Sequence, residues 1–548
     1  MPEEVSSQLG YTHHENSVPN APIQKDGLSG VDSGSLHEIQ VTETDRTDET
    51  DVDLHIKETM EIMAEGMSQM EVVNPEVLRV TQACRAFDHF AAALRSGTSG
   101  NQRDFYHKSR KSHKISTFWS HSWHGGHWKK ISTLIIFYNG TAAVSLGIIS
   151  GVVAMLLFRF GVLPGFETTY EGDMVKASVW SICSGFLVTC LVTIFWRPQS
   201  QVFFDRICIS QTDSDLKVHA VFSLSGLLRK TDTLLILWDP TWTERLWCLF
   251  ELAAFLQSKK SGKQALMIRP IFLGPVSIVV FVTFFVTLLP GTFSLNDSQE
   301  TGYMSNGAVM FVGLATMYPA VSAIRNYFRE LDTMKQQLLS ISFDSTRCAC
   351  CSLGHVYNGV PVPCDRKIVK ECVKTWFCSL HAFEATVRSE VLEVLNHDLS
   401  EKVFSIWWVL GVTAPIILAF MDLSATQVSG GPATAFVLQG LVIWLLALPA
   451  TNDLLISIPS IMRARPQNLA LEVVKNAVTL LLMALPLAMI VAVHGLAYSS
   501  LMPIPVGSFG DFREMVYFAC FCGFVLVLSL FHYLLGVGLK ALRKWPGW

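Results

Sequence analysis

The chain has 548 residues, of which 50% are hydrophobic and only 16% are charged, and its formal net charge is -4. This composition excludes a chain made only of ordinary soluble domains and indicates a polytopic membrane protein, whose main partner is the lipid bilayer. The sequence has no basic stripe with interleaved aromatic residues, which argues against binding to nucleic acid.

The N-terminal residues Met1–Asp53 are acidic and lack apolar periodicity, so we expect them to be disordered. They hold no apolar core of a signal peptide, and we expect the first membrane span to direct insertion itself. Residues 54–110 follow with helical spacing of their apolar residues and are predicted to form short cytosolic helices. Asn74-Pro75 is predicted to begin the second of two such helices.

Several later segments approach the roughly 20 apolar residues that are needed to cross the hydrocarbon core of a bilayer. The eight predicted spans are Thr133–Phe158, Ala177–Trp196, Gly274–Pro290, Gly307–Ile324, Val403–Met421, Thr434–Ala450, Val473–Val493 and Val516–Leu539. They form membrane hairpins at residues 133–196 and 274–324 and a four-span bundle at residues 403–540, before a tail at residues 541–548.

The charges of the loops predict the orientation in the membrane. Lys and Arg gather after the second, fourth, sixth and eighth spans, whereas the opposite loops hold almost none. The positive-inside rule therefore predicts that both termini and the long loops are cytosolic. The sequence does not indicate which membrane holds the protein.

The cytosolic segments on either side of the first hairpin, residues 111–132 and 197–273, alternate short apolar strands with helices. The predicted elements are strand Ile115–Trp119, strand Val202–Ile209 with Asp205 in its middle, helix Asp215–Leu228, strand Thr233–Trp238, helix Trp242–Gln257 and strand Ala265–Leu273. Such alternation predicts a parallel sheet. The predicted fold is therefore a polytopic α-helical membrane protein with a cytosolic, flavodoxin-like α/β domain that a membrane hairpin splits.

The run Leu234–Phe255 is the most informative part of this domain. It reads as a buried strand, a tight exit at Asp239-Pro240, and a helix that carries Trp247-Cys248-x-x-Glu251-Leu252. A glutamate in this position lies near the carboxyl edge of the parallel sheet, where open α/β folds build their ligand sites.

Three motifs resemble those of the Toll/interleukin-1 receptor (TIR) superfamily, in a divergent form seen in membrane proteins of protists. They are Phe118-Trp-Ser-His-Ser-Trp123, Phe204-Asp-Arg-Ile-Cys-Ile-Ser-Gln211 and Arg245-Leu-Trp-Cys-Leu-Phe-Glu-Leu252. The middle motif is also similar to the Cys-Ile-Asn-Gln signature of heterokaryon-incompatibility domains, which share a TIR-like fold. The resemblance covers only Lys111–Ile131 and Arg197–Leu273.

The resemblance implies that Glu251 stands where NAD-cleaving TIR domains keep their catalytic glutamate, with NAD as the substrate. Trp247, Asp205, His121 and Ser122 would then line the cleft. A carboxylate suits this reaction because it can stabilise an oxocarbenium-like transition state. The alternative is that Glu251 is a partly exposed helix residue and that the domain is a non-catalytic adaptor.

Two features depart from the TIR pattern. The hairpin at residues 133–196 occupies the place of the first helix, and the fifth strand and last helix are missing because the chain enters the membrane after Leu273. A complete NAD pocket therefore does not follow from the motifs alone.

The long cytosolic loop at residues 325–402 carries a second candidate site. Its potential ligands are Cys348, Cys350, Cys351, His355 and Cys364. Thiolate and imidazole groups at short spacing suit tetrahedral zinc. Their spacing is not that of paired Cys-x-x-Cys knuckles, however, and free thiols, some of them acylated near the membrane, are the favoured interpretation.

These features together favour a membrane-anchored signalling or assembly protein that acts through self-association or through other TIR-like domains, with NAD cleavage as a narrower hypothesis. The alternative class is a transporter or channel in which the α/β domain is regulatory or structural. Ionisable groups inside spans usually mark transport paths. The main interior candidates are Asn139 and His532, and this scarcity weakens the transporter hypothesis.

Overall fold

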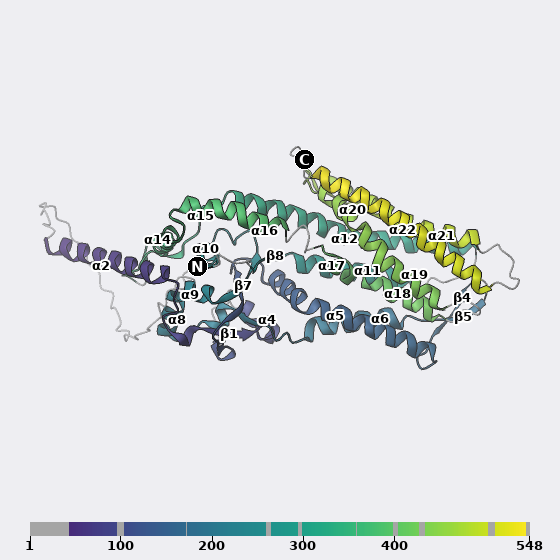
Figure 1. The fold of residues 1–548 in the computed structure, drawn as a ribbon, viewed down its shortest axis with the longest axis horizontal. Coiled ribbons are helices and arrows are strands. Elements are labelled where there is room, and N and C mark those ends of the chain that lie inside the picture. The colour runs from purple at the N-terminus through teal and green to yellow at the C-terminus, as the bar shows by residue number, and fades with distance from the viewer. Residues whose placement is uncertain are drawn as a thin grey trace, which may run out of the picture.

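The structure is a computed structural model that describes residues 43–95, 104–170, 173–258, 265–293, 299–357, 359–397, 404–426, 433–501 and 510–543. The molecule is elongated, with an α/β module at one end and a bundle of long helices at the other (Figure 1). Residues 1–42 of the segment Met1–Asp53, which was predicted to be disordered, lie outside the described residues. Its last residues, from Glu43 on, belong to helix α2 (Glu43–Ser68), so the prediction is wrong there.

A six-stranded sheet forms the α/β module. Its spatial order is β2-β1-β6-β3-β7-β8, and the four strands β6, β3, β7 and β8 are parallel. The strands are β1 (Arg79–Gln82), β2 (Arg110–Lys111), β3 (Ile115–His121), β6 (Gln201–Phe203), β7 (Thr231–Trp238) and β8 (Ala265–Pro270). The prediction of parallel strands is therefore confirmed for these four, whereas β1 pairs antiparallel with β2 and β6 and makes the sheet mixed. The strand order reverses beside β3, as in doubly wound folds.

Strand β7 shows why both faces of the sheet are covered. Leu234 and Ile236 pack in one apolar core with α10 (Leu246–Ser258) and α9 (Leu224–Arg229), while Leu235 and Leu237 pack in a second core on the opposite face. Alternate residues of a strand point to opposite faces, so a run that is apolar at every position requires two covering layers.

The first turns of α5 (His127–Arg159) help to cover the second face through Ile131 and Leu134. The long apolar helix α5 therefore supplies the covering helix whose absence the sequence suggested. The same face is covered by α4 (Asp88–Arg95), which follows α3 (Ala83–Ala86).

The segment before β3 differs from the prediction of short helices alone. Asn74 caps the 3-10 turn η1 (Pro75–Val77) as expected, but the chain then forms β1, which pairs antiparallel with β6. Val80 is completely buried there. A second short 3-10 turn, η3 (Tyr106–Lys108), precedes β2. The sequence of this segment is compatible with both a strand and a helix. It forms a strand because it can pair with the edge of β6.

The predicted strand Val202–Ile209 is wrong in its second half. Strand β6 ends at Phe203, and Asp205 is the first residue of a short helix, α7 (Asp205–Cys208). Phe204 and Ile207, three residues apart, are both fully buried, which suits one helical turn rather than a strand. Asp205 therefore lies just beyond the carboxyl end of β6 and not in the middle of the strand.

The predicted helix Asp215–Leu228 is two helices, α8 (Ser214–Phe222) and α9, with Ser223 at their junction. The Ser223 hydroxyl accepts a hydrogen bond of 3.0 Å from the backbone N–H of Val73. This contact ties the helix junction to the segment that follows α2.

The long helices form the second half of the molecule. They are α5, α6 (Trp180–Phe195), α11 (Leu273–Phe293), α12 (Gln299–Leu339), α17 (Ile406–Val412), α18 (Ala414–Ala425), α19 (Ala433–Val442), the π-helical turn η6 (Ile443–Ala447), α20 (Leu448–Ile461), α21 (Leu469–Leu501) and α22 (Gly510–Arg543). An antiparallel hairpin, β4 (Phe166–Tyr170) and β5 (Asp173–Ala177), connects α5 to α6.

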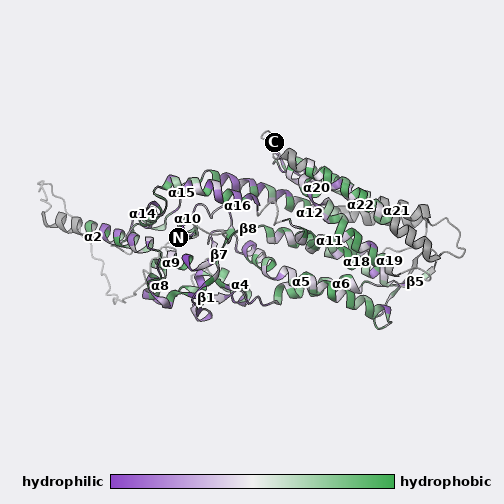
Figure 2. Cartoon of the chain, in the orientation of Figure 1, coloured by the Kyte–Doolittle hydropathy of each residue, from purple (hydrophilic) through white to green (hydrophobic). Residues whose placement is uncertain are grey.

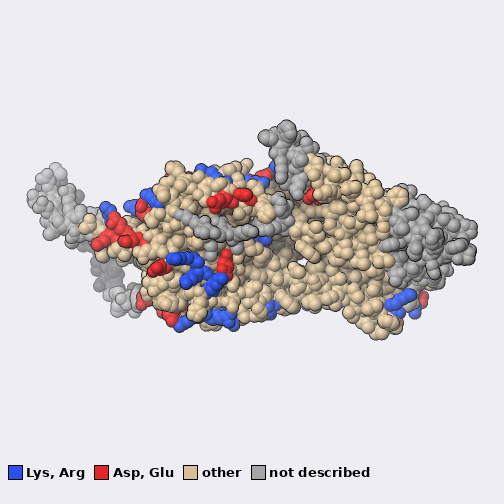
Figure 3. All heavy atoms as spheres, viewed as in Figure 1, with Lys and Arg blue, Asp and Glu red and all other residues tan. Residues whose placement is uncertain are grey.

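Among the residues that the structure describes, five helices are long and apolar enough to cross a membrane, or six if α17 and α18, which are bent by 51° relative to each other, are one span. At 16 residues, α6 is shorter than the roughly 20 that a span requires. Hydrophobic residues dominate α5, α6, α11 and α18 (Figure 2). On the face in Figure 3, Lys, Arg, Asp and Glu gather mainly over the half of the molecule that holds the α/β module. These helices are compatible with an integral membrane protein.

The cytosolic loop that was predicted after the fourth span packs on the module. It contains α13 (Ala349–Ser352), the hairpin β9 (Val356–Tyr357) and β10 (Val360–Pro361), α14 (Asp365–Phe377), α15 (Leu380–Thr386), the π-helical turn η4 (Val387–Val391) and α16 (Leu392–His397). Helix α14 lies against α2, where the indole N–H of Trp376 donates to the backbone carbonyl of Ser68 at 2.8 Å.

Candidate functional site

The carboxyl ends of β3 and β7 meet at the point where the strand order reverses. From β3 the chain continues to β6 on one side of the sheet and then to β7 on the other. His121, the last residue of β3, is in register with Leu237 of β7. Open α/β sheets bind their ligands in the crevice at this point, so we define the carboxyl-edge site as the polar side chains that gather here.

Glu251 belongs to this carboxyl-edge site. It lies in the second turn of α10, is half-buried, and its Oε2 atom is buried without a hydrogen-bond partner. Burial raises the pKa of Glu251 to about 8, a hydrogen bond with Ser120 opposes this, and the charge of Asp205 adds to it. Burial therefore favours the protonated form of Glu251, while the side chain as a whole is partly exposed and feels the charge of Arg245, as the alternative interpretation also expects.

His121 and Asp205 lie on the β6 side of Glu251. The His121 ring packs edge-on against Trp123 with centroids 4.5 Å apart, and the Trp123 indole N–H donates to Asp205 Oδ2 at 3.2 Å. Burial holds the pKa of His121 well below its usual value and raises the pKa of Asp205 to about 6. The buried Nε2 atom of His121 has no hydrogen-bond partner.

Ser122 links the ends of the two strands. Its hydroxyl lies 2.6 Å from the Thr241 hydroxyl, and Thr241 in turn donates its backbone N–H to Asp239 Oδ1 at 2.8 Å. Lys130 of α5 donates to the backbone carbonyl of Ser122 and lies 3.8 Å from Asp239 Oδ2. Four of the five predicted residues of the NAD hypothesis, namely Glu251, Asp205, His121 and Ser122, thus lie at this edge of the sheet.

The sequence interpretation missed Ser120, Lys130 and Asp239 as members of the carboxyl-edge site. Two turns in the sequence, at Asp239-Pro240 after β7 and at Gly125-Gly126 after β3, could have indicated that these loops lie together. A Cβ atom on Gly125 would lie 2.1 Å from Asp239 Oδ2, so only glycine allows this loop to approach the carboxylate. Paired turn signals after two neighbouring parallel strands indicate that their loops meet.

Trp247, which the NAD hypothesis assigns to the cleft of Glu251, makes its polar contact with α14. Its indole N–H donates to Asp365 Oδ2 of α14 at 3.3 Å, and its ring packs edge-on against Phe250. A cavity of about 190 Å³ opens at this first turn of α10, and its lining includes Arg245, Trp247, Cys348 and Asp365 but not Glu251. The indole of Trp247 reaches Asp365 because α14 packs against α10, a contact that the sequence did not indicate.

The potential metal ligands of the segment between α12 and α14 come together beside this cavity. The ligand atoms of Cys350, Cys351, His355 and Cys364 all lie within 4.8 Å of one another. Cys348 lies next to them, with its sulfur 3.0 Å from that of Cys350. The structure therefore brings together all five predicted ligands, although it records the described cysteines as free thiols.

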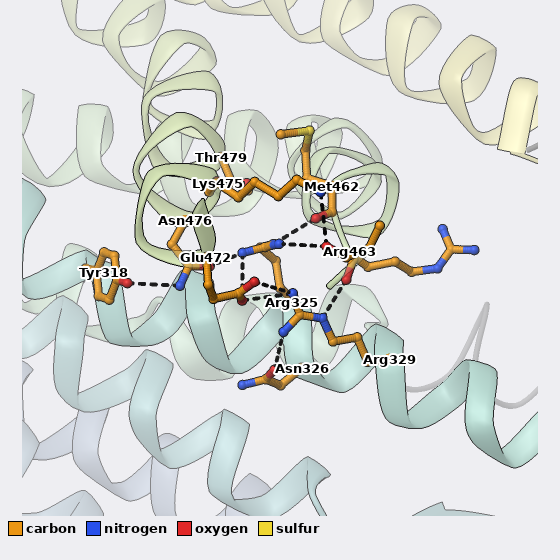
Figure 4. Close-up of polar contacts among 11 residues, drawn as sticks. Tyr318, Arg325, Asn326, Arg329, Met462, Arg463, Glu472, Lys475, Asn476 and Thr479 are labelled. Carbon is orange, nitrogen blue, oxygen red and sulfur yellow. Dashed lines mark hydrogen bonds and ion pairs between the residues drawn. The ribbon is translucent and has the colours of Figure 1, made fainter. Parts of the chain in front are cut away.

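A third polar cluster joins the long helices α12 and α21. Figure 4 shows Arg325 and Arg329 of α12 directed at Glu472 of α21, which they contact at 3.1 Å and 2.8 Å. Arg325 is completely buried and also donates to Asn476, which in turn donates to the Tyr318 hydroxyl at 3.1 Å. The sequence interpretation treated Arg325 and Arg329 only as loop charges and missed this cluster, because their partners lie about 150 residues away.

No model of a known protein family matches the chain, and neither the curated proteins nor the solved structures show a significant match to it. The TIR resemblance therefore stays a prediction, which rests on three sequence motifs.

Proposed function

We propose that this protein is a membrane-anchored signalling or assembly protein that acts through a cytosolic TIR-like module. In this proposal the chain crosses the membrane eight times and keeps both termini in the cytosol. The observation that carries the proposal is the direct continuation of sheet strands into long apolar helices. Only Ile271 and Phe272 separate β8 from α11, and residues 122–126 separate β3 from α5.

Such short connections couple the two halves mechanically. A shift of α5 or α11 moves the carboxyl end of the strand to which it is joined, because a connection of two to five residues cannot absorb a large displacement. The carboxyl-edge site lies between these strand ends. We infer that the membrane bundle controls the shape of this site.

Helix α12 supplies a second connection. Its 41 residues correspond to about 60 Å at 1.5 Å per residue, so it reaches from the bundle to the module. At its cytosolic end, Gln337 donates to the backbone carbonyl of Pro240 at 2.6 Å, directly after β7. At the bundle, Arg325 and Arg329 fix it to Glu472. The stretch of α12 between Arg325 and Gln337 is about 18 Å long at 1.5 Å per residue, and a helix that is fixed at both of these points transmits displacement between them.

Hydrogen–deuterium exchange of the full-length protein in lipid nanodiscs tests this coupling. In a Glu472→Leu variant, we expect faster exchange near the Arg325 contact and also in β7 and the first turn of α10. A matched control is Leu485→Ala, because Leu485 is exposed on the same helix and has 60% of its surface accessible. Faster exchange confined to α12 and α21 in the Glu472 variant would contradict the coupling.

A second candidate function, NAD cleavage, is favoured by a specific observation at the carboxyl-edge site. Three buried polar atoms there lack hydrogen-bond partners: His121 Nε2, Asp239 Oδ2 and Glu251 Oε2. Buried polar groups without partners are rare in folded proteins and indicate an unfilled role for water or ligand. The ribose hydroxyls and cationic ring of NAD offer complementary donors and charge.

In this reaction the bond between the ribose carbon and the nicotinamide nitrogen breaks, and its electron pair leaves with neutral nicotinamide. Water then adds to the oxocarbenium carbon and releases a proton. Ionised Glu251 would stabilise the positive charge of this intermediate. The cationic nicotinamide ring would favour this ionised form, since a nearby positive charge lowers the pKa of a carboxyl group.

Nicotinamide release by detergent-purified, full-length protein tests the second function. We expect turnover by the wild type and none by Glu251→Gln. The matched control is Asp232→Asn, because Asp232 lies at the amino end of β7, at the opposite edge of the sheet, and pairs with Lys114 at 2.8 Å. No release by folded wild-type protein would leave signalling through assembly as the function of the module.

The transporter hypothesis receives less support from Asn139 and Asp422, whose side chains bind backbone groups of α6. The Asn139 amide donates to the backbone carbonyl of Thr193 at 2.9 Å and thereby ties α5 to α6. Asp422 of α18 accepts hydrogen bonds from the backbone N–H groups of Ser181 and Ile182 and so caps the first turn of α6. The other candidate, His532, is buried, and its Nδ1 atom has no hydrogen-bond partner. A flux assay in reconstituted vesicles would detect any transport.

A further inference from the structure

We propose that Cys350, Cys351, His355 and Cys364 bind one structural zinc ion. This inference is independent of the signalling and NAD proposals, since it rests on the cytosolic loop alone. All four residues come from one short stretch, in which Cys350 and Cys351 belong to α13, His355 precedes β9, and Cys364 directly precedes α14. The hairpin β9–β10 returns the chain and brings Cys364 back beside α13.

The distances suit a tetrahedral ion. Two sulfurs bound to one zinc at about 2.3 Å lie about 3.8 Å apart in a regular tetrahedron. The sulfurs of Cys351 and Cys364 are 3.7 Å apart, and all four ligand atoms lie within 4.8 Å of one another. Three thiols and one imidazole form a Cys₃His set, which is a common set for structural zinc.

The surroundings of the four residues support a bound cation. His355 has a positive φ of 61°, a backbone conformation that costs energy for a residue other than glycine, and its buried Nε2 atom has no hydrogen-bond partner. The backbone N–H of Asp365 donates to the sulfur of Cys350 at 3.3 Å. Such a hydrogen bond stabilises a metal-bound thiolate and orients it.

Cys348 is assigned outside the ligand set. Its sulfur lies 3.0 Å from that of Cys350, which is closer than two sulfurs on one tetrahedral zinc ion. Cys348 instead lines the cavity at the first turn of α10 together with Trp247 and Asp365. The zinc ion would thus fix α13 and the beginning of α14 as one wall of this cavity.

Metal analysis of the full-length protein, purified without chelators, tests the proposal. We expect about one zinc per chain, as a single tetrahedral site requires, and an X-ray absorption spectrum that fits three sulfurs and one nitrogen. Cys351→Ser and Cys364→Ser should lose the zinc. Two matched controls should keep it: Cys348→Ser and Cys378→Ser, since Cys378 is exposed in the same loop.

A loss of zinc through misfolding is distinguished by two further measurements. His355→Cys offers a fourth thiolate in place of the imidazole and should retain zinc with an all-sulfur spectrum. A thiol-modifying reagent should release the ion from wild-type protein in the presence of a zinc indicator. Wild-type protein without zinc, or undiminished zinc in Cys351→Ser and Cys364→Ser, would overturn the proposal.

Discussion

The raised pKa of Glu251 predicts that the wild-type protein loses stability as the pH rises and that Glu251→Gln does not. In the unfolded chain Glu251 ionises near its ordinary pKa of 4.5, whereas in the folded protein burial keeps it protonated up to a pKa of about 8. Between these values the folded state holds more protons than the unfolded state. The stability contributed by the protonated group is therefore complete below pH 4.5 and is lost as the pH rises through 8.

The magnitude follows from the two pKa values. Each pKa unit corresponds to about 1.4 kcal/mol, so full ionisation of Glu251 in the folded protein costs roughly 5 kcal/mol. A glutamine has nearly the same shape, can still hydrogen-bond to Ser120, and does not ionise. The variant should therefore match the wild type at low pH and exceed it in stability by roughly 3 kcal/mol at pH 7.

Thermal unfolding of the detergent-purified protein, followed by intrinsic tryptophan fluorescence between pH 5 and 9, measures this difference. The unfolding temperature of Glu251→Gln should exceed that of the wild type by an amount that grows with pH. Glu393→Gln is the control, because Glu393 is exposed and should show no such trend. An equal difference at every pH, or a less stable variant at pH 8, would show that Glu251 is not held protonated in the folded protein.

Three other perturbations test other parts of the molecule. Glu472→Leu leaves the buried guanidinium of Arg325 without its carboxylate and should cost about 3–5 kcal/mol, measured as a lower unfolding temperature; an unchanged temperature would argue against the ion pair. Gly274→Ala should destabilise the protein by about 1–3 kcal/mol, because a Cβ atom at this position would lie 2.3 Å from the backbone of α5. In the control Gly66→Ala the added Cβ atom meets no atom within 4 Å, so this variant should stabilise α2 by about 0.5–1 kcal/mol. A membrane-impermeant maleimide should label the exposed Cys378 only from the cytosolic side of sealed vesicles, and labelling from the outer side would reverse the predicted orientation.

Elements that depend on local sequence patterns were predictable, whereas contacts between distant segments were not. The strand Thr231–Trp238 and the helix after it were predictable because an unbroken apolar run and a turn at Asp239-Pro240 are local signals. The long apolar helices were predictable for the same reason. Their number was not confirmed, since the described part of the chain has five or six helices that meet the requirement for a span.

The failures share a different cause. The segment around Val80 has helical spacing but forms strand β1, because it pairs with the edge of β6, which lies about 120 residues away in the sequence. Trp247 contacts Asp365 because α14 packs against α10. In each case the deciding contact is made by a segment that no local pattern connects with the residue.

The sequence by itself therefore indicated the division into apolar helices and an α/β module, and the TIR resemblance grouped Glu251, Asp205, His121 and Ser122 around one cleft. The tertiary structure alone decided that Glu251 is buried beside Ser120, that four Cys and His ligand atoms converge, and that Arg325 meets Glu472. The physical reason is that periodicity encodes which residues avoid water, whereas pKa values, metal geometry and buried ion pairs depend on distances between segments that are brought together only by packing.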